Sequence, residues 1–249
     1  MKYCNCLQAH NSERMIHMKK KSKFILSAVC GFLAALLIVF VRFVDVEPIG
    51  PEGTRIGLSH LNQAAFHIFG VNMLWYYITD WLGIVAILAA CLFAGMGFLQ
   101  MIRRRSILKV DREILLLGGL YIVVISLYVL FEAAIVNYRP ILMPDSIIPE
   151  ASFPSSHTML VCIIMGSTVM LMGKYIKGKT LRKVLQVICS AVIGITIIGR
   201  VISGVHWFTD IIGGVLISIS LLALYSGILE GIDELGFAER ENERSTCCN

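Results

Sequence analysis

The stretch Gly199-Arg-Val-Ile-Ser-Gly-Val-His-Trp-Phe-Thr-Asp210 separates two long apolar runs, at residues 184–202 and 207–229. Each run is long enough to cross about 30 Å of hydrocarbon as a helix. A polar interruption between two such runs predicts two membrane helices whose ends meet at this stretch.

Three side chains in this interruption can carry chemistry: Arg200, His206 and Asp210. His206 and Asp210 are four residues apart, so a helix that begins at Trp207 places both on one face. A carboxylate there can hold one imidazole nitrogen and leave the other free as a base or nucleophile. Arg200 supplies a planar cation suited to phosphate or carboxylate. The same residues also fit a simple membrane interface.

The composition is that of a membrane protein. Of the 249 residues 57% are hydrophobic and 16% are charged, whereas soluble domains have about 25% charged residues. The net charge of +5 follows from membrane topology, as argued below, so nucleic-acid binding is not expected.

Hydropathy predicts an all-α integral membrane protein with a bundle of six transmembrane helices. A short amphipathic helix at 56–69 is expected to lie in the interface after the first span, followed by an aromatic belt at Trp75, Tyr76 and Tyr77. We divide the chain into a basic tail at 1–23, a six-span domain at 24–229 and a tail at 230–249. The predicted spans are residues 24–43, 81–101, 114–136, 158–173, 184–202 and 207–229.

The positions of the basic residues predict the orientation. Eighteen of the 22 Lys and Arg lie in the two tails and in the loops 103–113 and 174–183. By the positive-inside rule, both termini are cytoplasmic. Arg139, His157, Arg200 and His206 then all fall at outer ends of spans, so the site is expected to face outward in the cell membrane.

Two further stretches lie on this outer side, Asn137-Tyr-Arg-Pro140 and Phe153-Pro-Ser-Ser-His157. Arg139 alone also fits an interfacial anchor. Ser155, Ser156 and His157 also fit a plain helix N-cap, although the free amides at such a helix start suit a phosphate equally.

Together the three stretches resemble the type 2 phosphatidic acid phosphatase family of membrane lipid phosphatases. That family's signature is a Lys, six residues and Arg-Pro; then Pro-Ser-Gly-His; then Ser-Arg, five residues, His, three residues and Asp. The resemblance spans about residues 130–213 and agrees in order and spacing. It departs at Glu132, which stands in place of the Lys, at Ser156 in place of the Gly, and at Gly199 in place of the Ser.

The resemblance implies a role for each site residue. His206 attacks phosphorus and forms a phosphohistidine, Asp210 orients His206, and His157 protonates the leaving oxygen and then activates water. No metal or cofactor is implied, and the sequence offers no set of residues with metal spacing. The residues that hold the phosphoryl oxygens are Arg139, Ser155, Ser156 and Arg200.

The expected partners are the bilayer and a lipid phosphate or pyrophosphate, with undecaprenyl pyrophosphate the first choice and phosphatidic acid or phosphatidylglycerophosphate also fitting. The oligomeric state is left open. The alternative function is that of a catalytically impaired relative that binds phospholipid head groups without turnover, since Glu132 replaces a Lys.

Several secondary expectations concern single residues. Glu132 is expected to pair with Arg139 or Arg200. Asp80 is interpreted as an interface residue, and Asp145 and Glu150 as lesser candidates for a direct role. The glycines at 199, 213 and 214 are expected to let the last two spans pack closely. The remaining histidines have no carboxylate at a useful spacing and are interpreted as surface or interface residues: His10, His17, His60 and His67.

Overall fold

The computed structural model describes residues 2–144 and 146–247, with side chains described from 20 to 232 except at 145. In this part of the chain all regular elements are helices. Six of them are long and apolar enough to cross a membrane, so the predicted all-α six-span bundle is confirmed. The helices are α1 (Lys2–Phe43), α2 (Ser59–Phe69), α3 (Met73–Arg104), α4 (Arg112–Ala133), α5 (Ser156–Tyr175), α6 (Lys179–Ser203) and α7 (Phe208–Cys247), with 3₁₀ turns at Pro51–Gly53 and Ile107–Lys109.

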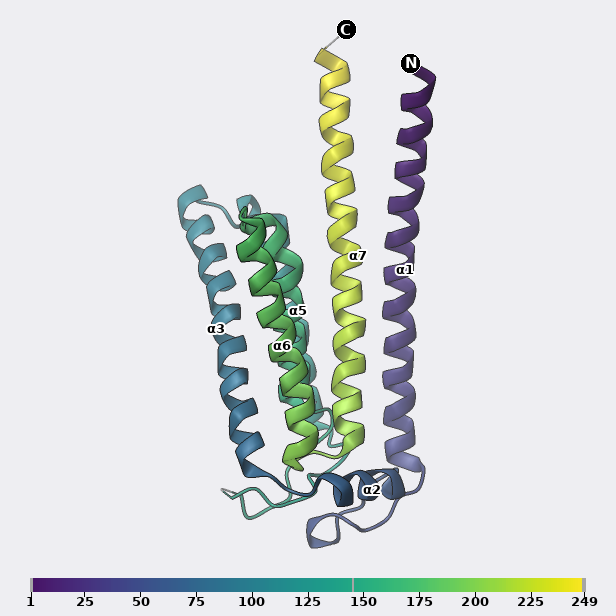
Figure 1. Ribbon diagram of the computed structural model, residues 1–249, viewed down its shortest axis with the longest axis vertical. Coiled ribbons are helices and arrows are strands. Elements are labelled where there is room, and N and C mark those ends of the chain that lie inside the picture. Colours follow the sequence, from purple (N-terminus) through teal and green to yellow (C-terminus); the bar gives the residue numbers. More distant parts are fainter. Residues whose placement is uncertain (1, 145, 248–249) are drawn as a thin grey trace.

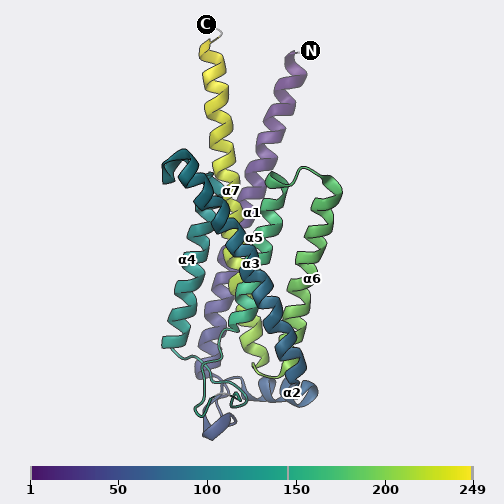
Figure 2. The same ribbon diagram turned by 90° about the vertical axis from the view of Figure 1, so that its left-hand side faces the viewer.

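The six long helices run along one axis, and α2 lies across one end of the bundle (Figure 1). Both chain ends lie at the opposite end, where α1 and α7 continue as helix through residues 2–19 and 233–247, which had been expected to be tails. The turns between α3 and α4 and between α5 and α6 lie at that same end (Figure 2).

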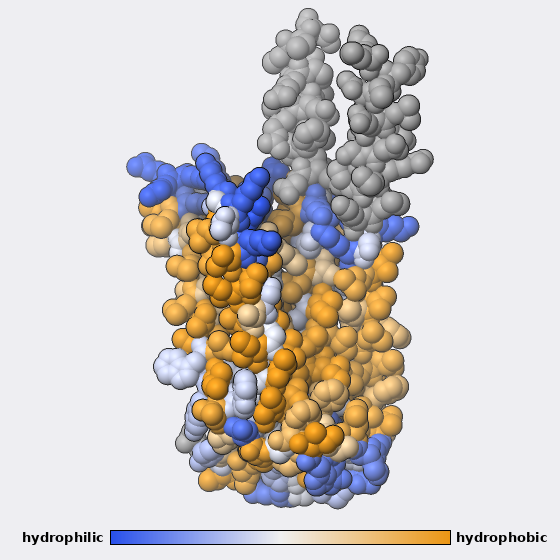
Figure 3. Space-filling view, viewed as in Figure 1, coloured by the Kyte–Doolittle hydropathy of each residue, from blue (hydrophilic) through white to orange (hydrophobic). Residues whose placement is uncertain are grey.

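Helix α5 is the centre of the bundle. Its side chains Met159, Ile163 and Leu171 are buried together with Leu117 and Val124 of α4. Its other face is buried against α3 and α6. The outer faces of the surrounding helices expose many Leu, Ile, Val and Phe side chains. Figure 3 shows them as an apolar belt between two hydrophilic ends, the pattern of a surface that faces lipid.

Helix α3 begins eight residues before the predicted span. Asn72 precedes it, and the Asn72 side chain accepts hydrogen bonds from the backbone N–H groups of Leu74 and Trp75 at 3.1 and 3.3 Å. Such an N-cap satisfies the free amides of the first turn. Because the helix starts here, Asp80 lies on a bundle helix rather than in a connector.

The expectation that glycines bring the last two spans together is wrong. A Cβ on Gly199 would lie 2.5 Å from Thr79 Cγ2, on α3. Cβ atoms on Gly213 and Gly214 would meet Phe153 and Thr158, before and in α5. The short link between α6 and α7 already joins their ends, so the glycines serve the approach of other helices.

Candidate active site

The predicted site residues gather at the end of the bundle that α2 covers (Figure 1). His157 is in the first turn of α5, Arg200 in the last turn of α6 and Asp210 in the first turn of α7, while His206 lies in the four-residue link between α6 and α7. Gly204 ends α6 with φ +64°, a left-handed conformation that glycine adopts without strain.

Arg139 comes from the long connection between α4 and α5, and backbone pairing holds it in place. The Arg139 N–H donates to Glu150 O at 3.0 Å, and the Ser152 N–H donates to Asn137 O at 2.9 Å. This short antiparallel contact carries Arg139 on one side and Ser152 on the other, so both reach the histidine cluster.

His206 is buried and is held through one ring nitrogen. Its Nδ1 lies 3.1 Å from both the backbone oxygen and the hydroxyl of Ser152. Its Nε2 is buried without a hydrogen-bond partner among the described residues. Burial lowers the pKa of His206 well below its usual 6.5, and the charges of Arg139, Arg200 and His157 lower it further. At neutral pH the imidazole is therefore uncharged, with a lone pair on Nε2 if Nδ1 carries the proton.

The spacing of the two residues predicts a direct hydrogen bond from His206 to Asp210, but the structure does not contain one. Asp210 Oδ2 lies 4.0 Å from His206 Nδ1, which is longer than a hydrogen bond. The hydroxyl of Ser152 stands between them and donates to Asp210 Oδ2 at 2.5 Å. The same oxygen accepts from the Trp207 N–H at 2.9 Å. This contact to the start of α7 resembles half of a capping box and draws the carboxylate away from the ring.

Ser152 and Asn137 are thus site residues that the sequence analysis did not single out. Asn137 Nδ2 donates to the other oxygen of Asp210 at 3.4 Å, and both residues are buried. Asn137 is the first residue of one quoted stretch and Ser152 directly precedes the other, and a buried carboxylate needs such donors. Their proximity to the motifs was the one available signal.

His157 and Arg200 share a partner, Asp80 of α3. Asp80 Oδ1 lies 3.0 Å from His157 Nε2 and 2.5 Å from Arg200 Nη2. The Arg200 side chain is completely buried, and its Cζ lies 5.0 Å from the centre of the Tyr76 ring. The interpretation of Asp80 as an interface residue is therefore wrong.

Arg139 pairs with Glu150, with Nε 3.1 Å from Glu150 Oε2. Glu150, a lesser candidate from the sequence, thus contacts a site residue, whereas Asp145 lies outside the described residues. Arg139 also lines a small cavity with Glu132, Ser152, Ser156 and His206.

The expected pairing of Glu132 with Arg139 or Arg200 is wrong, since those arginines pair with Glu150 and Asp80. Glu132 is exposed, in the last turn of α4. An exposed carboxylate keeps its hydration and needs no ion pair, which explains how it is retained at the end of a membrane helix.

Ser155 stands at the N-cap position of α5, but its side chain makes no capping hydrogen bond. Instead its Oγ accepts from Thr158 Oγ1 at 3.0 Å, and its backbone N–H donates to Asp210 O at 3.0 Å. The plain N-cap interpretation does not describe this serine. Its backbone joins the start of α5 to the start of α7.

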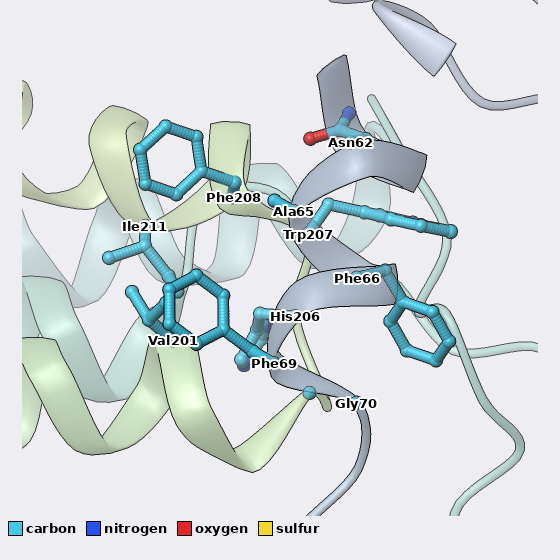
Figure 4. Close-up of a pocket in the computed structure, with 11 residues that line it drawn as sticks. Asn62, Ala65, Phe66, Phe69, Gly70, Val201, His206, Trp207, Phe208 and Ile211 are labelled. Carbon is cyan, nitrogen blue, oxygen red and sulfur yellow. The ribbon is translucent and has the colours of Figure 1, made fainter. Parts of the chain in front are cut away.

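Helix α2 packs against Trp207 and Thr209, which lie beside the site residues His206 and Asp210. Asn62 donates to Thr209 Oγ1 at 3.0 Å and accepts from the Thr209 N–H at 3.2 Å. The rings of Phe66 and Trp207 lie 5.7 Å apart. Figure 4 shows α2 beside the link that carries His206, with a small pocket between them. The predicted interfacial helix is therefore docked on the start of α7 through Asn62 and Phe66.

A second group of polar side chains comes from the first turn of α2 and from the connection before it. His60 Nδ1 lies 2.6 Å from Asp45 Oδ1, so the expectation that His60 has no carboxylate partner is wrong. Glu47 lies close enough for all three to contact one cation. Asp45 already accepts hydrogen bonds from Ser59 Oγ and the His60 N–H at 2.9 Å each, which caps α2 and explains the group structurally.

The fold and the site together define a six-span membrane helix bundle with two histidines, two aspartates and two arginines gathered at one end. Residues 132–231 match the model of the PAP2 superfamily, and this range contains every site residue predicted from the sequence. The resemblance to this family is confirmed. The match also supports a phosphatase.

The structure is similar to the crystal structure of a transmembrane PAP2 type phosphatidylglycerolphosphate phosphatase from Bacillus subtilis, with a TM-score of 0.57. The two chains are 18% identical, and the match covers 83% of this chain and 96% of the other. At this identity the comparison shows a shared fold. No curated protein sequence matches the chain.

Proposed function

We propose that the protein is a lipid phosphatase that hydrolyses a phosphomonoester or pyrophosphate at the outer membrane face through a phosphohistidine on His206. One observation carries the proposal: His206 Nε2 is buried without a hydrogen-bond partner among the described residues, while Nδ1 contacts Ser152. This is the arrangement of an activated nitrogen nucleophile.

In the first step His206 Nε2 attacks phosphorus, and the bond from phosphorus to the leaving oxygen breaks. The leaving oxygen takes a proton from His157. In the second step water attacks phosphorus and gives a proton to His157, the bond from phosphorus to His206 Nε2 breaks, and inorganic phosphate leaves. Arg139, Arg200, Ser155 and the amides near Ser156 stabilise the negative charge on the phosphoryl oxygens.

The substrate presents its phosphate at the interface and keeps its tail in the bilayer, because the site lies at one end of the apolar belt (Figure 3). Undecaprenyl pyrophosphate is our first choice, with phosphatidic acid and phosphatidylglycerophosphate as the other members of this class. The reaction needs no metal ion, because the histidines and arginines supply both the nucleophile and the charge stabilisation.

The alternative is a binding protein without turnover, which an exposed Glu132 at the cavity beside Arg139 favours. The intact histidines and Asp210 favour the enzyme. A protein that only binds head groups has no use for a neutral, unpartnered imidazole nitrogen.

The test is an assay of the purified protein with the three lipids, with and without EDTA. We expect release of phosphate from at least one lipid, unchanged by EDTA, and acid-labile labelling of the protein by substrate carrying radioactive phosphorus. His206→Ala should lose the label and at least about 10³-fold in turnover. His67→Ala, an exposed histidine of α2, is the matched control and should keep both.

Wild-type protein that binds these lipids without releasing phosphate would favour the binding alternative. A label that persists in His206→Ala would assign the nucleophile to another residue.

A further inference from the structure

One face of α3 forms a wall of the site. Tyr76, Thr79, Asp80 and Gly83 have the spacing i, i+3, i+4 and i+7, which places them on a single side of a helix. Tyr76 and Asp80 contact Arg200, Thr79 lies against Gly199, and Gly83 lies against His157. Outside the spacing itself, the sequence motifs of the site give no indication of this face.

Asp80 is the shared anion of two site residues that come from different helices. Its Oδ1 accepts from Arg200 Nη2 at 2.5 Å and lies 3.0 Å from His157 Nε2. Arg200 is fully buried, and its Nε and Nη1 lack hydrogen-bond partners among the described residues. A buried cation of this kind needs an anion nearby, and Asp80 supplies it while leaving two donor groups of Arg200 for a ligand.

Two glycines create the space for these contacts. A Cβ on Gly83 would lie 3.2 Å from His157 Cδ2, and a Cβ on Gly199 would lie 2.5 Å from Thr79 Cγ2. Gly83 therefore admits the imidazole of His157 against α3. Gly199, one residue before Arg200, lets α6 approach α3 closely. This close approach explains why a glycine stands here in place of the Ser of the family signature.

We infer that Asp80 is a positioning residue for His157 and Arg200, so that the site contains a direct His–Asp pair in addition to His206 and Asp210, which are linked through Ser152. The inference rests on the proposed function. Asp80 accepts the Nε2–H of His157, which makes Nδ1 the nitrogen that exchanges a proton. That Nδ1 is buried and without a hydrogen-bond partner in the described chain.

The proton balance follows from this geometry. Protonated His157 gives the Nδ1 proton to the leaving oxygen and becomes neutral, with its remaining proton on Nε2. Neutral His157 then accepts a proton from the attacking water at Nδ1. Asp80 holds the Nε2–H through both steps and stabilises the imidazolium form, which is the role of the aspartate in a catalytic triad.

The kinetic test is a double-mutant cycle. Asp80→Asn should lower kcat on a lipid phosphate by at least about tenfold, within the roughly 10²–10⁴-fold that general acid–base catalysis supplies. In a His157→Ala background the same change should lower kcat by a clearly smaller factor, because Asp80 then has only Arg200 left to orient. Equal losses in both backgrounds would overturn the inference.

Asp111→Asn is the matched control, since Asp111 also anchors α3, through Arg104 and Gln100 at the opposite end. It should leave kcat within about threefold of wild type. If Asp80→Asn does not fold, Asp80→Glu serves instead: it keeps a charge for Arg200, and its displaced carboxylate should give the same non-additive loss with His157→Ala. A rise in kcat or in phosphate affinity on removing the charge would show that Asp80 blocks the phosphate position, and would overturn the inference.

A second measurement does not depend on turnover. In protein labelled with ¹⁵N-histidine, the His157 signals, assigned by their loss in His157→Gln, should show a proton fixed on Nε2 in the wild type. Asp80→Asn should give a mixture of tautomers. An unchanged Nε2–H form would reject the pairing even if the protein proved not to be a phosphatase, and a fixed tautomer in an inactive protein would reject only the proposed function.

Discussion

Glu132 adds a negative charge to the cavity beside Arg139 and His206. In the resembling family a Lys stands at this position, whereas here an exposed carboxylate lines the cavity that also contains Arg139 and His206. Its arginine neighbours have other partners, so its charge is not neutralised by them. A negative charge at this point opposes an incoming phosphate.

We therefore predict that Glu132→Lys lowers the KM for a lipid phosphate. The expected change is about two- to tenfold, because exposed charges interact by only about 0.2–1 kcal/mol and here the sign is reversed. Glu132→Gln should give about half of this effect on a logarithmic scale. The measurement is KM at low and high ionic strength, and salt should reduce the difference. A higher KM in Glu132→Lys would mean that Glu132 assists binding of the substrate.

At the level of elements, α2 and the start of α7 form one unit. The side chain of Asn62 is completely buried and uses its amide in hydrogen bonds with Thr209 and with Gly57 O. Thr209 directly precedes Asp210 in the first turn of α7. The position of the Asp210 carboxylate therefore depends on a helix that lies outside the membrane-spanning bundle.

Asn62→Ala should lower both the thermal stability and the turnover of the protein. Removal of the amide leaves the buried Thr209 N–H and hydroxyl without these partners, and such a loss costs about 1–3 kcal/mol. The measurements are thermal unfolding in detergent and kcat on a lipid phosphate. Gln63→Ala, at the exposed neighbouring position, is the control and should change neither. Wild-type values for Asn62→Ala would mean that α2 does not support the site.

Comparison of the elements shows what the sequence could predict. Long apolar runs identified six spans, because a membrane helix must be apolar over about 20 residues. The spacing of His206 and Asp210 placed Asp210 in the first turn of the last span, with His206 just before it. Ser152 and Asp80 were missed, because they reach the site only through the packing of the 134–155 connection and of α3. The direction of the Asp210 carboxylate was also missed, since the backbone N–H of Trp207 competes with His206 for that carboxylate.

At the level of the whole molecule, the clusters of Lys and Arg in the turns lie at one end of the bundle and the site lies at the other. The chain ends and the turns that carry Arg103–Arg105 and Lys177–Lys183 lie at one end, and α2 and the site lie at the other (Figures 1 and 2). The positive-inside rule assigns the basic end to the cytoplasm. The site would then open on the outer face.

This orientation predicts the labelling of single cysteines in intact cells, after the native cysteines have been removed. Cysteines at Thr54 and Ser146, on the connections at the site end, should react with a thiol reagent that does not cross the membrane. A cysteine at Ser106, in the turn after α3, should react only after the cells are permeabilised. That second reaction is the control, because it shows that the Ser106→Cys thiol is accessible. Labelling of Ser106→Cys in intact cells, with protection of the other two, would invert the topology: the site would face the cytoplasm, and its substrate would have to be a lipid phosphate of the inner leaflet.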